Sequence, residues 1–144
     1  MSELTITEKT LITGYQNEFY FRTGKKIQIS VLDEWESLCR IEGTMPLTTL
    51  TTLICEALNT TMDDVFVAQK KDDLVIKRGV IFFILSKNAI SNQKIAQLSN
   101  RNNSHIHYAL KGFSVRLEYD HTAVELLKNA MKFIKDTINS VTIN

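Results

Sequence analysis

Residues 74–86 read LVIKRGVIFFILS, and nine of these thirteen side chains are apolar. A helix that is apolar on most sides has little surface suited to water, so it belongs at the centre of a core. Proline occurs once, at Pro46, and glycine five times in the whole chain, which favours helices joined by short turns. The sequence therefore predicts a mainly α-helical fold built around this segment.

The chain has 144 residues, enough for one domain with extensions and for a core that needs no disulfides or metal ions. The tripeptide that ends at Pro46 interrupts the periodic segments and marks the first expected boundary. We expect an N-terminal extension at residues 1–43, a central domain at residues 44–118 and a C-terminal helix at residues 119–144.

Apolar residues recur at helical spacing in several further segments. Helices are expected at residues 7–22, 33–41, 48–58, 92–98 and 102–111, and from residue 120 to about residue 140. Residues 25–31 alternate apolar and polar side chains, as a strand or an extended segment does, and residues 60–64 are expected to form a turn. The helix after Asn102 is expected to stop at Gly112, because glycine commonly terminates helices.

Charge is distributed unevenly along the chain. The formal net charge is only +1, yet residues 70–116 contain nine Lys or Arg and two acids, Asp72 and Asp73, so this stretch carries +7 and the remainder −6. No acid lies between Asn88 and Arg116. Such asymmetry is typical of a polyanion-binding face. The alternative interpretation is a chance clustering of charges in a small protein.

Two cysteines, Cys39 and Cys55, lie in apolar-periodic segments. We expect buried thiols of a cytosolic protein rather than a disulfide. No apolar run approaches the roughly 18 residues of a membrane span, and the N-terminal residues lack the basic and apolar regions of a signal peptide. The expected location is therefore the cytoplasm, with no membrane partner.

The histidines give little indication of a metal site. His105 and His107 are two residues apart, and on a helix their rings point about 200° apart, so they do not chelate one ion together. No glycine-rich phosphate loop and no catalytic constellation stands out. We expect neither a metal, nor a cofactor, nor an enzyme.

A short helix, a polar turn and a second capped helix follow one another in residues 91–112. Ser91 is a suitable N-cap for the first helix, Ser99 and Asn100 form the turn, and Asn102 is a suitable N-cap for the second. This order is that of a helix-turn-helix. The inner face of the second helix is expected to consist of Ile106, Ala109, Leu110 and Phe113.

The opposite face of that second helix carries hydrogen-bonding groups and no acid. It comprises Arg101, Ser104, Tyr108 and Lys111, with His105 and His107 on the flanks and Asn103 in the first turn. Amides and hydroxyls suit base edges, cations suit phosphate oxygens, and a helix N-terminus adds a favourable dipole. The alternative is an ordinary amphipathic surface helix, although such helices are usually rich in glutamate.

Three segments together resemble domain IV of DnaA, the DNA-binding domain of the bacterial replication initiator, which belongs to the Trp-repressor-like helix-turn-helix group. TTLICEALNTTMDDVF resembles the opening helix and the turn toward the basic loop, LVIKRGVIFFILS the long helix, and SNQKIAQLSNRNNSHIHYALK the signature around the recognition helix. The resemblance covers residues 46–118, about half the chain. It implies a helix-turn-helix core with N- and C-terminal helical extensions.

The resemblance also implies which residues read bases. The family signature is an Arg followed by Asp, His, Thr and Thr, positions that supply major-groove contacts. Here Arg101 keeps the Arg, while Asn102, Asn103, Ser104 and His105 replace the other four. The replacements keep hydrogen-bonding chemistry and change the pattern of donors and acceptors. One residue is missing from the turn before the Arg.

The family's basic loop sends an Arg into the minor groove. In this chain the loop reads QKKDD, and Asp72 falls near the position of that Arg. Contacts to the DNA backbone are still expected from this loop and its surroundings. In total, the residues expected to contact DNA are Lys70, Lys71, Arg78, Lys94, Arg101, Asn102, Asn103, Ser104, His105, Tyr108 and Lys111.

We therefore expect a protein that binds double-stranded DNA, either a sequence-specific regulator or an accessory replication factor. Because the sequence contains no nucleotide-binding domain, it does not predict an ATP-driven initiator. The alternative function is a non-catalytic protein-interaction module that has kept the fold and lost DNA binding. Asp72 and the acidic outer segments favour that alternative.

The C-terminal helix carries an apolar seam. Val124, Leu127, Met131, Ile134, Ile138 and Val141 are spaced by 3, 4, 3, 4 and 3 residues, as in nearly three heptads. The seam predicts either packing against residues 7–22 or a homodimer through this helix. A second apolar face, formed by Leu126, Ala130 and Phe133, favours the homodimer, as does the gain from reading two half-sites.

Overall fold

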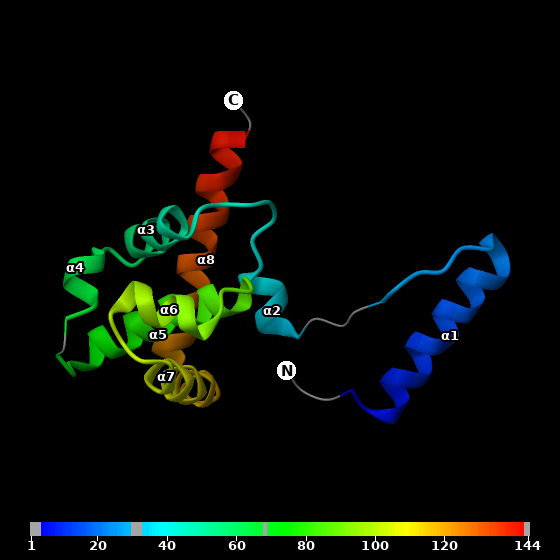
Figure 1. Cartoon of the computed structure of the whole chain (residues 1–144), viewed down its shortest axis with the longest axis horizontal. Helices are drawn as coiled ribbons and strands as arrows, with labels where there is room; N and C mark the ends of the chain where they lie inside the picture. Colours follow the sequence, from blue (N-terminus) through cyan, green and yellow to red (C-terminus); the bar gives the residue numbers. More distant parts are fainter. Residues whose placement is uncertain (1–3, 30–32, 68, 143–144) are drawn as a thin grey trace. The chain divides into compact units, whose positions relative to one another are not determined.

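The structure, a computed structural model, describes residues 4–29, 33–67 and 69–142 (Figure 1). Across these ranges all regular secondary structure is helical and no strand forms, so the prediction of a mainly α protein is confirmed. No helix in the described ranges combines the length and the apolar character needed to cross a lipid bilayer. The chain divides into two compact units, residues 1–37 and 38–144.

The first unit contains α1 (Ile6–Thr23), close to the helix expected at residues 7–22. Thr5 and Glu8 form a capping box at its start, with Oγ1 of Thr5 accepting a hydrogen bond from the Glu8 amide at 3.1 Å. The helix ends at Gly24, whose φ of 71° is the left-handed conformation that glycine adopts without strain. None of the residues of α1 is buried.

The segment that follows α1 was expected to be a strand or extended chain. Residues 25–29 form no strand, and two hydrogen bonds join them to α1: Nε2 of Gln16 donates to the carbonyl oxygen of Ile27 at 3.4 Å, and the Lys25 amide donates to Oγ1 of Thr23 at 3.1 Å. The segment is thus extended chain rather than a strand, because no second strand pairs with it among the described residues. Residues 30 and 31 lie outside those residues.

The second unit is built around α5 (Asp72–Lys87), as the sequence predicts. Nine of its residues are buried, among them Ile81, Ile84 and Leu85, whose side chains are completely inaccessible to solvent. Each such side chain contributes roughly 1.5–3 kcal/mol through its removal from water. The other helices of the chain are α2 (Glu34–Cys39), α3 (Leu47–Ala57), α4 (Met62–Val65), α6 (Asn92–Ser99), α7 (Asn103–Arg116) and α8 (His121–Thr142).

Helices α3, α4, α6, α7 and α8 all contact α5 (Figure 1). Helix α7 approaches α5 closely at Gly79, where an added Cβ would overlap the ring of Phe113. The same ring lies against Phe83, with centroids 5.5 Å apart. The glycine inside the apolar segment therefore serves helix packing.

Asn88 connects the beginning of the second unit to the end of α5 through side-chain hydrogen bonds. Its Nδ2 donates to the carbonyl oxygen of Cys39 at 2.8 Å, and its Oδ1 accepts from the amide of Ile41 at 2.8 Å. These bonds satisfy the backbone where the chain enters the core. Cys39 and Cys55 are both buried and form no disulfide, as predicted, and burial raises the pKa of the Cys55 thiol to about 11.

Two expected boundaries are wrong. Helix α7 does not stop at Gly112 but continues to Arg116, because Phe113 and Leu117 have to reach the core from the next turn of helix. Residues 60–64 are more than a turn, because they lead into the single helical turn of α4. Thr61 caps α4 by accepting a hydrogen bond from the Asp64 amide at 3.2 Å.

Helix α8 lies on α3 and α5 with the apolar seam facing inward. Asp120 precedes it and accepts hydrogen bonds from the amides of Thr122 and Ala123 at 3.0 and 3.3 Å. The central seam residues are completely inaccessible to solvent, and these are Leu127, Met131 and Ile134. The seam is therefore used largely by the core of its own unit, while the side chain of Val141 lies outside the described residues.

Candidate nucleic-acid interface

Helices α6 and α7 pack against each other and are joined by three residues, 100–102. Ser91 caps α6, with its Oγ accepting from the Lys94 amide at 3.3 Å, and Asn102 caps α7, with its Oδ1 accepting from the His105 amide at 2.7 Å. Both caps were predicted from the sequence and are confirmed.

The turn between these helices is tight because Asn100 adopts the left-handed conformation, with φ 55° and ψ 47°. The amide of Arg101 then donates to the carbonyl oxygen of Ala96 at 2.9 Å, and the amide of Asn100 to that of Gln97 at 3.4 Å. This is a Schellman motif, in which asparagine replaces the usual glycine. It ends α6 and turns the chain directly into the cap of α7.

The outer face of α7 is exposed along its length. Exposed side chains are those of Asn103, Ser104, His105, His107, Tyr108 and Lys111. On the other side Ile106 and Phe113 are buried and Ala109 and Leu110 half-buried, so the predicted division into two faces is confirmed. The outer face lacks acids and offers amide, hydroxyl, imidazole and ammonium groups to a partner.

Arg78 and Arg101 stabilise the loop between α4 and α5 by donating hydrogen bonds to its carbonyl oxygens. Arg78 is 8% exposed and donates to the carbonyl oxygens of Val65, Val67 and Gln69, the last at 2.5 Å. Burial lowers the pKa of Arg78. This guanidinium, which the sequence placed among the DNA contacts, is thus surrounded by the carbonyl oxygens of its own loop.

Arg101 joins the same loop to the turn between α6 and α7. Its Nη1 donates to the carbonyl oxygens of Ser99 at 2.9 Å and Phe66 at 3.4 Å, and its Nη2 to that of Val67 at 3.4 Å. The guanidinium also lies over the Phe66 ring, 5.8 Å from the centroid. The geometry gives Arg101 the role of positioning the loop beside the start of α7.

A groove of about 830 Å³ separates that loop and the start of α5 from α7. Its lining combines cations and aromatic rings, among them Lys70, Arg101, His105, Tyr108, Arg116 and Tyr119. Burial lowers the pKa of His105, and the charges of Arg101, Arg78 and Lys70 lower it further. These influences favour the neutral imidazole, which can both donate and accept a hydrogen bond.

Of the remaining predicted contacts, Lys70 lines this groove. Lys70 and Lys71 are exposed in the loop before α5, and Lys94 is exposed in the first turn of α6. The structure thus brings the loop and the outer face of α7 to the two sides of one groove. Arg78 also lines the groove, although its guanidinium donates hydrogen bonds to carbonyl oxygens of the loop.

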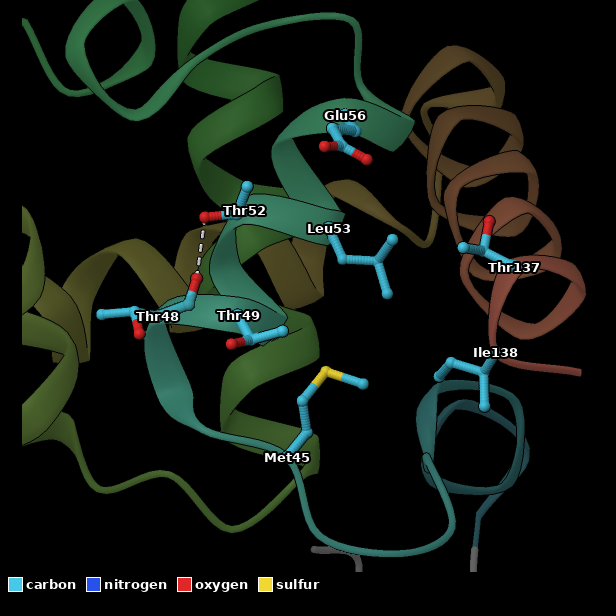
Figure 2. A pocket seen from close by; sticks show the side chains of 8 residues that line it. All are labelled: Met45, Thr48, Thr49, Thr52, Leu53, Glu56, Thr137 and Ile138. Carbon is cyan, nitrogen blue, oxygen red and sulfur yellow. Dashed lines mark hydrogen bonds between the residues drawn. The ribbon is translucent and has the colours of Figure 1, made fainter. Parts of the chain in front are cut away.

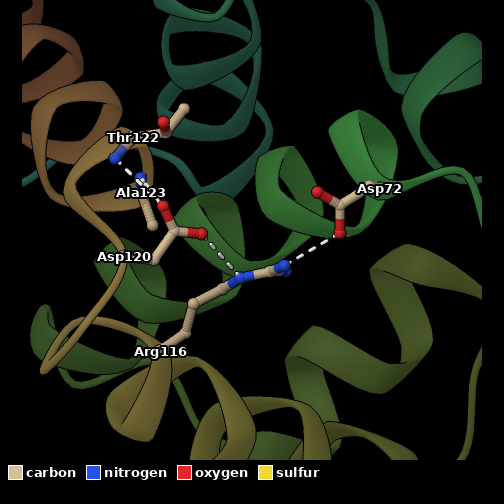
Figure 3. Close-up of polar contacts among 5 residues, drawn as sticks. All are labelled: Asp72, Arg116, Asp120, Thr122 and Ala123. Atoms are coloured by element: carbon tan, nitrogen blue, oxygen red, sulfur yellow. Dashed lines mark hydrogen bonds and ion pairs between the residues drawn. The ribbon is translucent and has the colours of Figure 1, made fainter.

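Arg116 is a groove residue that the sequence interpretation left out. Its Nη2 lies 2.8 Å from Oδ1 of Asp72 and its Nε 3.0 Å from Oδ2 of Asp120, so it connects the ends of α5, α7 and α8 (Figure 3). The hydrogen bond to Asp72 raises the pKa of Arg116 more than any other influence. The missing signal was the helix length: eleven residues after His105, Arg116 returns to the same side of a continuous helix.

A second cavity, of about 590 Å³, lies between α3 and α8 (Figure 2). Its described lining consists of Met45, Thr48, Thr49, Thr52, Leu53, Glu56, Thr137 and Ile138, which include no Lys or Arg. The hydroxyls of Thr52 and Thr137 donate to carbonyl oxygens of their own helices, both at 2.8 Å. This cavity therefore lacks the charge that a nucleic acid requires.

Within the described ranges, no three His, Cys, Asp or Glu side chains lie close enough together to hold a metal ion. No protein-family model matches this chain, and no curated protein matches it either. The resemblance to DnaA domain IV stays a prediction that depends on the residues quoted for it.

Proposed function

We propose that residues 38–144 bind double-stranded DNA as a helix-turn-helix, with α7 in the major groove. The observation that carries this proposal is the exposed, acid-free face of α7 at the side of a groove lined by cations. Base edges require hydrogen-bonding groups on a helix that fits the groove, and phosphates require cations beside it. The resemblance of residues 46–118 to DnaA domain IV supports the same function.

In this arrangement the first turn of α7 reads bases. Asn103, Ser104 and His105 are exposed there, directly after the cap residue Asn102. Tyr108 follows one turn later and is 70% exposed. Changes to these side chains are expected to alter sequence preference more than affinity for random DNA.

The exposed lysines bind the phosphate backbone. Lys70, Lys71, Lys94 and Lys111 lie on the loop, on α6 and on α7, with their side chains exposed. If each neutralises one phosphate, the logarithm of the affinity falls with the logarithm of the salt concentration with a slope of about −3.6. Arg78 and Arg101 contribute by holding the loop in place.

The test is fluorescence anisotropy with a labelled random duplex of about 25 base pairs, which exceeds two helical turns. Lys111→Gln should weaken binding about fivefold near 100 mM salt and make the slope less steep by about 0.9, the loss of one phosphate contact. Lys9→Gln, an exposed helical lysine in residues 1–37, is the matched control and should leave both values unchanged.

Absence of salt-dependent binding to any duplex would contradict the proposal. Selection of bound sequences from random duplexes then separates a regulator or replication factor that recognises a site from a protein that binds DNA without preference. A recovered motif that changes on mutation of Asn103 or Ser104 supports base reading by α7.

A second function, a protein-interaction module without DNA binding, is favoured by one set of observations. Two of the predicted DNA contacts, Arg78 and Arg101, already donate hydrogen bonds to carbonyl oxygens of the loop. On and just after α7, Val115 is 50% exposed and Tyr119 is 70% exposed. Apolar and aromatic groups of this kind are common in protein interfaces.

The homodimer belongs to the proposal as well, through the side of α8 that the core leaves exposed. Phe133 is 43% exposed there, whereas Leu127 and Met131 are inaccessible. Two copies that each place α7 in a major groove engage two half-sites together, which strengthens binding without any new contact to DNA.

A further inference from the structure

Arg116 has two carboxylate partners that differ in how firmly they are held. Asp120 is 21% exposed and uses both oxygens, one for Arg116 and one for the amides at the start of α8. Asp72 is 76% exposed, and its Oδ1 accepts a hydrogen bond from Nη2 of Arg116 at 2.8 Å. Asp120 is therefore held in place by the start of α8 as well as by Arg116, whereas Asp72 contacts Arg116 from the protein surface (Figure 3).

The pair between Arg116 and Asp72 is easily opened. Exposed ion pairs contribute at most about 1 kcal/mol, because water screens the charges and ordering both side chains costs entropy. A guanidinium has five N–H donors, and a phosphate accepts two of them side by side. Arg116 already lines the groove together with Lys70 and Tyr108.

We propose that Arg116 is a phosphate-binding residue of this interface, covered by Asp72 in the unbound protein, and that a backbone phosphate of DNA displaces Asp72. The inference rests on the proposed function, because the phosphate belongs to the duplex that α7 binds. Asp120 keeps Nε of Arg116 in place during the exchange, so the guanidinium stays directed at the groove.

The next residue of α5 provides a matched control. Asp72 and Asp73 both lie in the first turn of α5 and both are exposed, so their replacement by asparagine removes the same charge from the same helix end. Of these two aspartates, Asp72 is the one that forms an ion pair with Arg116. A purely long-range effect of charge is expected to be similar for the two variants.

The experiment measures binding of a random duplex by wild type, Asp72→Asn and Asp73→Asn over a range of salt concentrations. Asp72→Asn should bind about tenfold more tightly near 100 mM salt, with a salt slope close to that of wild type, because Arg116 contacts a phosphate in both complexes. Asp73→Asn should change affinity about twofold at most, as one screened charge does at this ionic strength.

Equal effects of the two variants would overturn the proposal and leave the proposed function standing. Weaker binding by Asp72→Asn would also overturn it, since Asp72 would then position the loop for DNA. If neither wild type nor Asp72→Asn binds any duplex, the proposed function and this inference fail together. Salt-dependent binding by Asp72→Asn alone would support both.

A second variant connects the effect to Arg116. In the Arg116→Gln background, Asp72→Asn should give no more gain than Asp73→Asn, provided that the thermal transition shows both double variants to be folded. Should Arg116→Gln fail to fold, the arginine Nε–Hε and Nη resonances of the wild type give the same answer. Addition of duplex should shift the Nη signals of Arg116, and unchanged signals in the bound state would overturn the proposal.

Discussion

Cys55 shows how a single buried group connects stability to pH. Its side chain is 2% exposed, and burial raises its pKa from 9.0 to about 11. The folded state therefore keeps the thiol neutral at a pH where the unfolded chain already ionises. The stability that this provides is complete below pH 9 and is lost as the pH rises from 9 toward 11.

Urea unfolding of wild type at pH 8 and pH 10 should reveal this loss. We expect a decrease of about 1 kcal/mol in the free energy of unfolding that Cys55→Ala does not show. Because other groups also titrate in this range, the informative quantity is the difference between the two proteins. A parallel decrease in both would contradict the assignment to Cys55.

At the scale of elements, the contact between α5 and α7 depends on a missing side chain. Gly79 faces the Phe113 ring, whereas a Cβ at Gly112 would meet no described atom within 4 Å. Gly79→Ala should therefore lower stability by about 1–3 kcal/mol, because the ring has to move within a packed core. Gly112→Ala, at an exposed helical position, should raise stability by about 0.5–1 kcal/mol.

Both changes replace glycine by alanine inside a helix, so each is the control of the other. The measurement is the midpoint and slope of urea unfolding for the two variants. Equal effects of the same sign would show that helix propensity, and not the approach of α5 to α7, dominates at these positions.

Local signals made several elements predictable. Helix ends are marked by residues whose effect is local, namely the N-caps Ser91 and Asn102 and the C-terminal Gly24. Each of them contacts backbone groups of its own helix, so the residue type alone identifies the helix end. The end of α7 was not predictable in this way, because the burial of Phe113 and Leu117 depends on a helix far away in the sequence.

The roles of the arginines were also not predictable from the sequence, because they depend on contacts between residues that are far apart in the chain. A cluster of positive residues predicts a surface for a polyanion, but it does not reveal which cations bind carbonyl oxygens of their own chain. Arg78 and Arg101 do so across 9 to 35 residues of sequence. Arg116 was missed because the helix that carries it was expected to end too early.

At the scale of the whole molecule, the proposed homodimer depends on α8. Since Leu127, Met131 and Ile134 are buried in the core, the side of α8 marked by Phe133 is the one that we propose for association. Light scattering at micromolar concentration should give a dimer mass for wild type and a monomer mass for Phe133→Ser. A monomer mass for both proteins would remove the homodimer while leaving DNA binding unaffected.

The two guanidinium groups under the loop have a consequence for the thermodynamics of association. Arg78 and Arg101 connect the described residues of the loop to α5 and to the turn before α7, and the carbonyl oxygen of Val67 accepts a hydrogen bond from each of them. The conformational entropy of these two segments is thus lost before any partner arrives. Binding to a preorganised surface of this kind loses less conformational entropy, so more of the favourable free energy of each contact appears as affinity.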